Sequence, residues 1–103
     1  MNNKTIPIII QHFHGCPSGP KMIEFVQEAI LPYKDMVDYQ EIIIDNDESA
    51  KKNKFRGSPT LLIDGIDFEN MPEPENPSMA CRFYSKGLPN INEIKDRIKK
   101  ALN

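Results

Sequence analysis

The 103-residue sequence contains no tryptophan, only two cysteines and no run of more than three consecutive apolar residues. A helix that spans a bilayer needs about 20 apolar residues, which excludes such a helix here. No charged and then apolar signal segment opens the chain, so we expect a cytoplasmic protein. A basic surplus is also missing, since 13 basic and 15 acidic side chains give a net charge of −2. Nucleic acid and membrane are therefore not expected partners.

The remaining composition is that of an ordinary soluble domain. Apolar residues make up 39% of the chain and charged residues 27%. A chain of this length can bury one core without disulfide bonds or a structural metal. We therefore expect a single domain over residues 1–103 and a monomer.

The apolar pattern predicts alternating strands and helices. A β-branched run predicts a strand at 6–13, and a stretch that begins with alternation and finishes as a buried run predicts a second strand at 37–45. A 3.6-residue period predicts a helix from Lys21 that ends at Pro32. Asp45 or Asp47 is expected to cap a short helix that runs to Lys54. The order of these elements favours an α/β sandwich built on a βαβ unit.

The second half of the chain continues the pattern. A third strand is predicted at 60–64 before an Asp64-Gly65 turn, and a fourth at 80–84. Between them, the acidic, proline-rich residues 66–79 form a long loop of the kind that is usually functional or disordered. Asn90 and Glu93 have the spacing of a capping box, which predicts a last helix from 91 to 102.

Cys16 lies where the first strand gives way to the helix. A cysteine at a helix start meets the positive end of the helix dipole, which lowers the pKa of the thiol below about 8.5. Pro17 and Pro20 have no N–H, so the expected donors to its sulfur are the amides of Ser18 and Gly19 and the Ser18 hydroxyl. The alternative is that Cys16 is only a small buried residue at a tight turn.

A second feature is Gly57-Ser58-Pro59-Thr60, just before an apolar strand. Taken alone, Pro59 marks an edge or a turn and its peptide bond is expected to be trans. Together with Cys-Pro at a helix start some forty residues earlier, the pattern resembles the thioredoxin-like superfamily. The resemblance implies a three-layer α/β/α sandwich with a mixed four-stranded sheet, Cys16 as the nucleophile and Pro59 as the cis-proline beside it. It also implies that the Ser58 backbone is free to pair with an extended peptide.

The resemblance extends to Phe55-Arg56-Gly57-Ser58-Pro59-Thr60 followed by Cys81-Arg82-Phe83-Tyr84. This combination looks like a set of small bacterial thioredoxin-like proteins, some labelled as related to alkylmercury lyases. The chain departs from thioredoxins at Gly19, where the family carries its second, resolving cysteine. Three alternatives follow: Cys81 resolves Cys16, Cys16 acts alone, or the fold serves only for binding.

The function implied by the resemblance is a thiol–disulfide oxidoreductase that lacks the usual second cysteine. Its catalytic residues would be Cys16, Cys81 and Pro59, with Ser58, Ser18 and Gly19 at the substrate, and no cofactor. The partner would be a small thiol or a protein with a thiol or disulfide. The alternatives are a redox-inactive binding module, or soft-metal or organomercurial binding by Cys16 and Cys81.

His12 and His14 add a separate hypothesis. Two residues apart at a strand end, they are expected to point the same way and form His-x-His-x-Cys with Cys16. Three such ligands can hold a transition metal. Alternatively, a protonated His14 stabilises the Cys16 thiolate. In the simplest interpretation, His14 is exposed and His12 is hydrogen-bonded at the strand end.

Overall fold

A computed structural model describes residues 5–103. Strands and helices alternate along most of the chain, as the sequence predicts. The strands are β1 (Ile6–His12), β2 (Val37–Ile43), β3 (Thr60–Ile63) and β4 (Ile66–Asp67). The helices are α1 (Ser18–Ile30), α2 (Asp47–Lys52) and α3 (Ile91–Leu102), with a short 3-10 helix, η1 (Leu31–Met36), between α1 and β2.

The four strands form one mixed sheet in the order β2-β1-β3-β4. β1 is parallel to β2, with Ile6 opposite Val37, and antiparallel to β3, with Ile10 opposite Leu61. β4 pairs antiparallel with β3 at the outer edge. This register places the carboxyl end of β1, which leads to Cys16, beside the start of β3, which follows Ser58 and Pro59.

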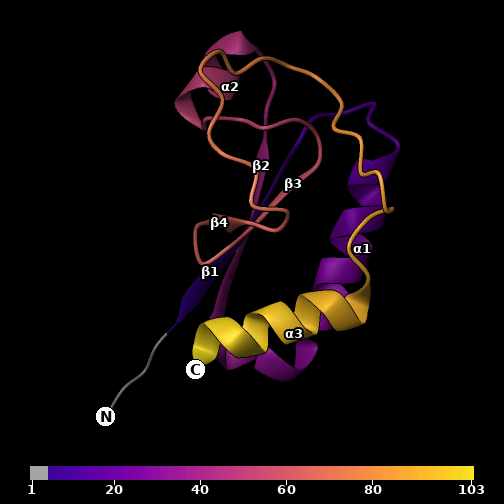
Figure 1. Cartoon of the computed structure of the whole chain (residues 1–103), viewed down its shortest axis with the longest axis vertical. Helices are drawn as coiled ribbons and strands as arrows, with labels where there is room; N and C mark the ends of the chain where they lie inside the picture. The colour runs from indigo at the N-terminus through magenta and orange to yellow at the C-terminus, as the bar shows by residue number, and fades with distance from the viewer. Residues whose placement is uncertain (1–4) are drawn as a thin grey trace.

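The main core lies between the sheet and two helices. Alternate residues of β1 and β3 point to the same face because side chains in a strand alternate. These side chains pack with the apolar stripes of α1 and α3, which lie on the same side of the sheet in Figure 1. The fully or almost fully buried members from the strands are Ile6, Ile8, Ile10, Leu61 and Ile63, and those from the helices are Met22, Val26, Ala29, Ile94 and Ile98.

A smaller core cluster supports the other end of the sheet. Ile44, Ala50 and Phe55 are buried together under α2, which lies away from α3 in Figure 1. The Phe13 ring meets the Phe55 ring edge to face, with 6.2 Å between centroids. This cluster fixes two segments of the chain. Phe13 lies just before the turn that carries Cys16, and Phe55 lies just before Ser58.

The ends of the helices differ in part from the prediction. α3 has the predicted bounds, and the Asn90 and Glu93 side chains form the capping box. α1 begins at Ser18 rather than Lys21, since Gly19 and Pro20 both fit a first helical turn. α1 ends at Ile30, close to the predicted end at Pro32, and the chain continues through Pro32 into η1, which is kinked at Tyr33.

Two further expectations about elements are wrong. Asn46, and not Asp45 or Asp47, caps α2, because its side chain accepts from the Ser49 amide at 2.7 Å. β2 is not a buried run at its end, since it is an edge strand and Ile43 is 41% exposed.

The fourth strand is not where the sequence predicts it. Residues 80–84 form only an isolated bridge at Cys81, and β4 takes the edge of the sheet instead. The Asp64-Gly65 turn is present, with φ of 55° and 81°, so the chain reverses at once and Ile66 pairs with Ile63. A strand of two residues gives almost no period to recognise, and the sequence therefore does not reveal it.

The result is a mixed α/β domain with a four-stranded mixed sheet and three α-helices. The radius of gyration of 13.4 Å is that of a single compact domain of this length. Within residues 5–103, no helix is long and apolar enough to cross a membrane.

Candidate functional site

Cys16 lies in a tight connection between β1 and α1. Gly15 has a φ of +95°, which glycine adopts without steric strain, and Pro17 is the N-cap of α1. The Cys16 carbonyl accepts the Gly19 amide at 3.2 Å, which closes the first turn over the cysteine. As a result, the Cys16 side chain is buried at the start of the helix, 5% exposed.

Ser58 is the residue that joins Cys16 to the rest of the sheet. It is fully buried, and the Cys16 thiol donates to its carbonyl oxygen at 3.2 Å. Its hydroxyl accepts the Phe13 amide at 3.2 Å, which ties the end of β1 to the same residue. The Ser58–Pro59 peptide bond is cis, as the resemblance implied.

The segment that carries Cys81 pairs with Ser58 from the other side. The Ser58 amide donates to the Ala80 carbonyl at 2.9 Å, and the Arg82 amide donates to the Ser58 carbonyl at 2.8 Å. These two bonds make a parallel bridge between Ser58 and Cys81. The expectation that the Ser58 backbone is free to bind a peptide is therefore wrong, since residues 80–82 occupy both of its groups.

Both cysteines are thiols, and they differ in exposure. Cys16 is buried, whereas Cys81 is exposed. Their side chains are close enough for each thiol to shift the pKa of the other. Of the three alternatives left open by the missing cysteine at position 19, this contact favours the one in which Cys81 partners Cys16.

The environment of Cys16 favours its thiolate. Burial raises the pKa of the thiol, but hydrogen bonds from the Ser58 side chain, the Ser18 and Gly19 amides and the Cys81 thiol outweigh it. The net result is a Cys16 pKa below the ordinary value. The two predicted amide donors are confirmed, whereas the Ser18 hydroxyl is not among the donors, and Ser58 supplies the hydroxyl instead.

The pKa of Cys81 is shifted in the opposite direction. Local desolvation, its hydrogen bond to Cys16 and repulsion from the Cys16 thiolate all raise the pKa of Cys81. Loss of a proton from one sulfur therefore disfavours loss of a proton from the other. Of the two thiols, Cys16 is therefore the one that loses its proton more readily.

A buried ion pair holds the Cys81 segment in place. Two guanidinium nitrogens of Arg82 contact the two carboxylate oxygens of Asp67 at 2.6 and 2.8 Å, and both residues are buried. The Asp67 carboxylate also accepts the amides of Glu69 and Met71. Burial raises the pKa of Asp67, but the bonds from Arg82 and these amides lower it overall. These bonds fix Arg82, the residue that directly follows Cys81, in place.

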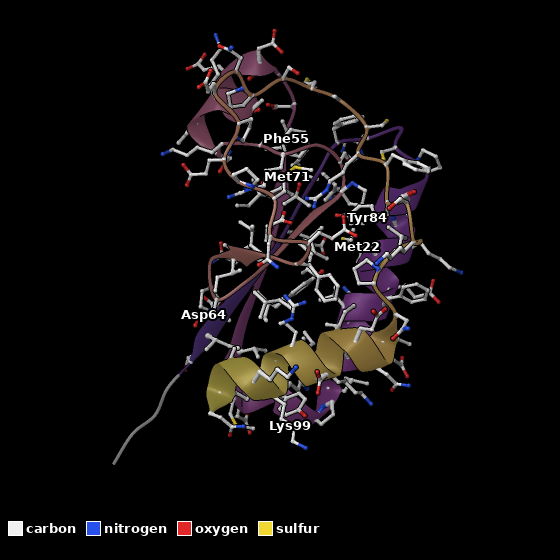
Figure 2. The ribbon with its side chains drawn as sticks, in the orientation of Figure 1. Met22, Phe55, Asp64, Met71, Tyr84 and Lys99 are labelled. Atoms are coloured by element: carbon white, nitrogen blue, oxygen red, sulfur yellow. The ribbon has the colours of Figure 1, made fainter. Side chains whose placement is uncertain are left out.

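Two more contacts strengthen this anchor. The Tyr84 hydroxyl donates to the Pro59 carbonyl at 2.6 Å, and the Arg82 guanidinium lies 4.8 Å from the centre of the Tyr84 ring. In Figure 2, Tyr84 lies on the irregular segment that runs beside α1, next to Met22. The sequence gives no structural role to Arg82, Asp67 or Tyr84, because their partners are distant in sequence and no local pattern connects them.

Gly57 makes the close approach of this segment sterically feasible. Its φ is +108°, and a Cβ at this position would lie 2.8 Å from the Cβ of Arg82. A side chain at position 57 would therefore push Arg82, and Cys81 with it, away from Ser58. The glycine in the Gly57-Ser58-Pro59 motif is explained by this contact.

Gly19 and the histidines complete the site. Gly19 is buried, and a Cβ there would meet Nδ1 of His12 at an ordinary 3.6 Å. His12 is buried, and its Nε2 has no hydrogen bond and lies 4.0 Å from a Glu41 carboxylate oxygen, whereas His14 is exposed. His14 is not among the groups that lower the pKa of Cys16. Within residues 5–103, no three His, Cys, Asp or Glu side chains gather as a metal site.

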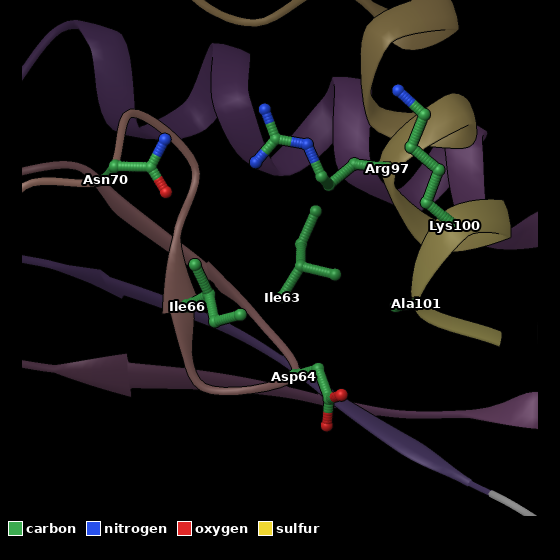
Figure 3. Close-up of a pocket in the computed structure, with 7 residues that line it drawn as sticks. All are labelled: Ile63, Asp64, Ile66, Asn70, Arg97, Lys100 and Ala101. Atoms are coloured by element: carbon green, nitrogen blue, oxygen red, sulfur yellow. The ribbon is translucent and has the colours of Figure 1, made fainter. Parts of the chain in front are cut away.

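Two pockets lie at different distances from this chemistry. A pocket of about 300 Å³ between β4 and α3, lined by Ile66 and Arg97 among others, contains neither cysteine (Figure 3). A smaller pocket of about 160 Å³ has Cys81 in its wall. Residues 71–78 of the long acidic loop form the other side of this smaller pocket, which places the loop beside Cys81.

Comparisons with known proteins add no assignment. No protein-family model matches the chain, and no curated protein matches it either. The site is therefore interpreted from its own geometry.

Proposed function

We propose that the protein is a thiol–disulfide oxidoreductase of thioredoxin-like fold whose redox pair is Cys16 and Cys81. The observation that carries the proposal is the position of Ser58. Its carbonyl oxygen accepts a hydrogen bond from the Cys16 thiol, and its backbone forms a parallel bridge with the Cys81 segment. Two thiols that flank one buried residue are held close together without a Cys-x-x-Cys motif. Cys81 thus supplies the second thiol, which thioredoxins carry at the position of Gly19 and which Gly19 cannot provide.

The local chemistry supports exchange in this pair. Thiol–disulfide exchange needs a thiolate that attacks a sulfur and a second thiol that completes the reaction. Cys16 provides the stabilised thiolate, and Cys81 is accessible from solvent. In the oxidised protein, a Cys16–Cys81 disulfide would form, and the fully protonated dithiol would lose two electrons and two protons to the oxidant.

The test is to equilibrate the protein in graded mixtures of reduced and oxidised dithiothreitol and to follow its intact mass. We expect a single transition with the loss of two hydrogens per monomer. Cys16→Ser and Cys81→Ser should each abolish that transition, whereas Ser18→Ala, a matched change at the helix start, should retain it.

Three outcomes would overturn the proposal: oxidation only to disulfide-linked dimers, oxidation only to sulfenic acid, or tight binding of Hg²⁺ by a pair that never forms a disulfide. The first two would show that Cys81 does not resolve Cys16. The third would favour a soft-metal site, because two adjacent thiolates also suit that chemistry.

A further inference from the structure

We propose that the pocket beside Cys81 receives a small disulfide that carries a carboxylate, that Arg56 binds this carboxylate, and that Cys81 forms the first mixed disulfide. The inference rests on the proposed redox pair and adds the order of its steps and its substrate class. It reverses the roles that the family resemblance implies, in which Cys16 attacks the substrate first and Cys81 then resolves the mixed disulfide.

The exposure of the two sulfurs sets this order. Cys81 is exposed and lines the pocket of about 160 Å³, whereas Cys16 is 5% exposed and lines neither of the two pockets described above. Exchange needs access to the attacking sulfur as well as thiolate character. A disulfide that enters this pocket therefore meets Cys81 before it meets Cys16.

The walls of the pocket indicate the kind of molecule. Phe55, Met71 and Pro77 provide apolar surface, and Phe55 and Met71 lie together between α2 and the centre of the sheet in Figure 2. The volume is close to that of a cavity of about 150 Å³ that takes one benzene ring. Such a space accommodates one half of a low-molecular-weight disulfide and not a folded protein.

Arg56 provides the charge selectivity. It is the only Arg, Lys, Asp, Glu or His among the residues that line this pocket. Its Nε donates to the Met71 carbonyl at 2.9 Å, which fixes the side chain along the wall. Among the described residues, no carboxylate forms an ion pair with it. The two terminal nitrogens of its guanidinium therefore remain for a carboxylate, which they match in geometry.

The backbone around Ser58 argues against an extended peptide as the substrate. The Ser58 amide and carbonyl are already bonded to Ala80 and Arg82, so an incoming strand finds no free partner there. A protein disulfide would have to displace this segment, and the buried Arg82–Asp67 pair opposes that displacement. A small disulfide needs no such movement.

The steps balance with the disulfide as the oxidant. Cys81 passes its proton to the neighbouring Cys16 thiolate, and the Cys81 thiolate attacks one sulfur of the bound disulfide. The disulfide bond breaks, and the first thiolate leaves and takes the proton from Cys16. The Cys16 thiolate then attacks the Cys81 sulfur and expels the second thiolate. The dithiol loses two electrons, and one disulfide becomes two thiols, one of them ionised.

The order of steps is tested with 3,3′-dithiodipropionate, a small disulfide with two carboxylates, added to the full chain. In Cys16→Ser we expect a stable mixed disulfide on Cys81, identified by peptide mass spectrometry. In Cys81→Ser we expect a mixed disulfide to form much more slowly, because the remaining thiol, Cys16, is buried. A faster adduct on Cys16 in Cys81→Ser than on Cys81 in Cys16→Ser would overturn the proposed order.

The role of Arg56 is tested by comparing that reagent with neutral 2-hydroxyethyl disulfide. Arg56→Met should lower the ratio of the two oxidation rates, anionic to neutral, by about fivefold, the scale of a solvent-exposed ion pair. Lys52→Met removes an equal charge from the exposed face of α2 and should leave the ratio as in wild type. Far-UV circular dichroism checks that each variant is folded.

The outcomes separate this inference from the proposed function. If no oxidant forms the Cys16–Cys81 disulfide, the redox function itself fails. If that disulfide forms but Arg56→Met leaves the rate ratio unchanged, or lowers it no more than Lys52→Met does, the carboxylate-binding pocket is wrong and the redox pair stands.

Discussion

The segments that carry Cys16 and Cys81 reach the same residue, Ser58, by different means. Cys16 is positioned by short-range features, namely a glycine turn, a proline N-cap and the first turn of α1. Cys81 lies in a stretch without regular structure and is positioned by contacts with β3, β4 and Pro59. The first segment depends on local backbone geometry, and the second depends on a buried ion pair.

The comparison explains why the two cysteines have different properties. The start of a helix supplies amides to a sulfur and so favours a thiolate at Cys16. In the segment that carries Cys81, successive side chains are alternately exposed and buried. Arg82 and Tyr84 are buried, whereas Cys81 and Phe83 are exposed, so the Cys81 sulfur is accessible to solvent. Stabilised charge and accessibility thus come from different parts of the chain.

The largest expected effect comes from breaking the anchor of the second segment. Arg82→Met leaves the buried Asp67 carboxylate without its cation, which should lower the free energy of unfolding by about 3–5 kcal/mol. Urea denaturation at pH 7 measures this loss. Hydrogen exchange should accelerate more in residues 79–84 than in residues 13–19.

The control is Lys100→Met, which removes an exposed ion pair with Asp96 and should change stability by less than about 0.5 kcal/mol. The pH dependence gives a second check. The folded pKa of Asp67 is depressed, so its stabilisation is present above its unfolded pKa of about 3.9 and is lost as the pH falls through the lower folded pKa. Equal effects of the two substitutions would contradict the anchor.

Two glycines sharpen the same comparison. Gly57→Ala should cost about 2–4 kcal/mol, because positive φ costs about 1–2 kcal/mol and the contact with Arg82 adds an overpacking penalty. Gly15→Ala also has positive φ but meets no atom within 4 Å, so it should cost about 1–2 kcal/mol. Thermal and urea unfolding of both variants measure the difference, and a Gly15→Ala loss as large as that of Gly57→Ala would contradict it.

The next effect concerns the pKa of Cys16. Ser58→Ala removes the hydrogen bond that lowers this pKa most, so the pKa should rise and the thiolate fraction at pH 7 should fall. Cys81→Ala should act in the same direction and less strongly, since its bond is a smaller cause. Rates of Cys16 alkylation by iodoacetamide between pH 5 and pH 10, followed by peptide mass spectrometry, measure the shift.

Ser18→Ala is the matched control for these two variants, because it keeps the backbone amide that favours the thiolate. It should leave the alkylation midpoint of Cys16 where wild type has it. A wild-type midpoint at or above the free-cysteine value of about 8.5 would refute the stabilised thiolate altogether.

The smallest effect on stability is expected from Gly19→Cys. Gly19 has no positive φ and lies in a helix, so a side chain there should stabilise the protein by about 0.5–1 kcal/mol. The new thiol gives Cys16 a neighbour in a Cys-x-x-Cys spacing, and we expect faster reduction of insulin by dithiol-reduced protein than in wild type. Gly19→Ala controls for stability, and equal insulin reduction by all three proteins would count against a site built for exchange.

The sequence predicts those parts of the fold that depend on near neighbours. The capping box at Asn90, the turn at Asp64 and the start of a helix soon after Cys16 depend on residues within a few positions of one another. The cis bond at Pro59 was expected only from the family resemblance, since local preference favours trans.

The sequence does not predict the parts that depend on distant partners. Arg82 and Asp67 are 15 residues apart, with no periodic signal between them. The edge position of β2, which exposes Ile43, follows from the strand order and not from its apolar run. For the same reason, the sequence pairs Cys81 with Cys16 only as one of several alternatives.

Ser58 also has a consequence for how the protein is made. It contacts a thiol 42 residues before it in the chain and a segment well after it, so the thiol pair cannot form in a partial chain. During synthesis, Cys16 leaves the ribosome long before Cys81, so their native positions beside Ser58 require a chain that has been made past Arg82.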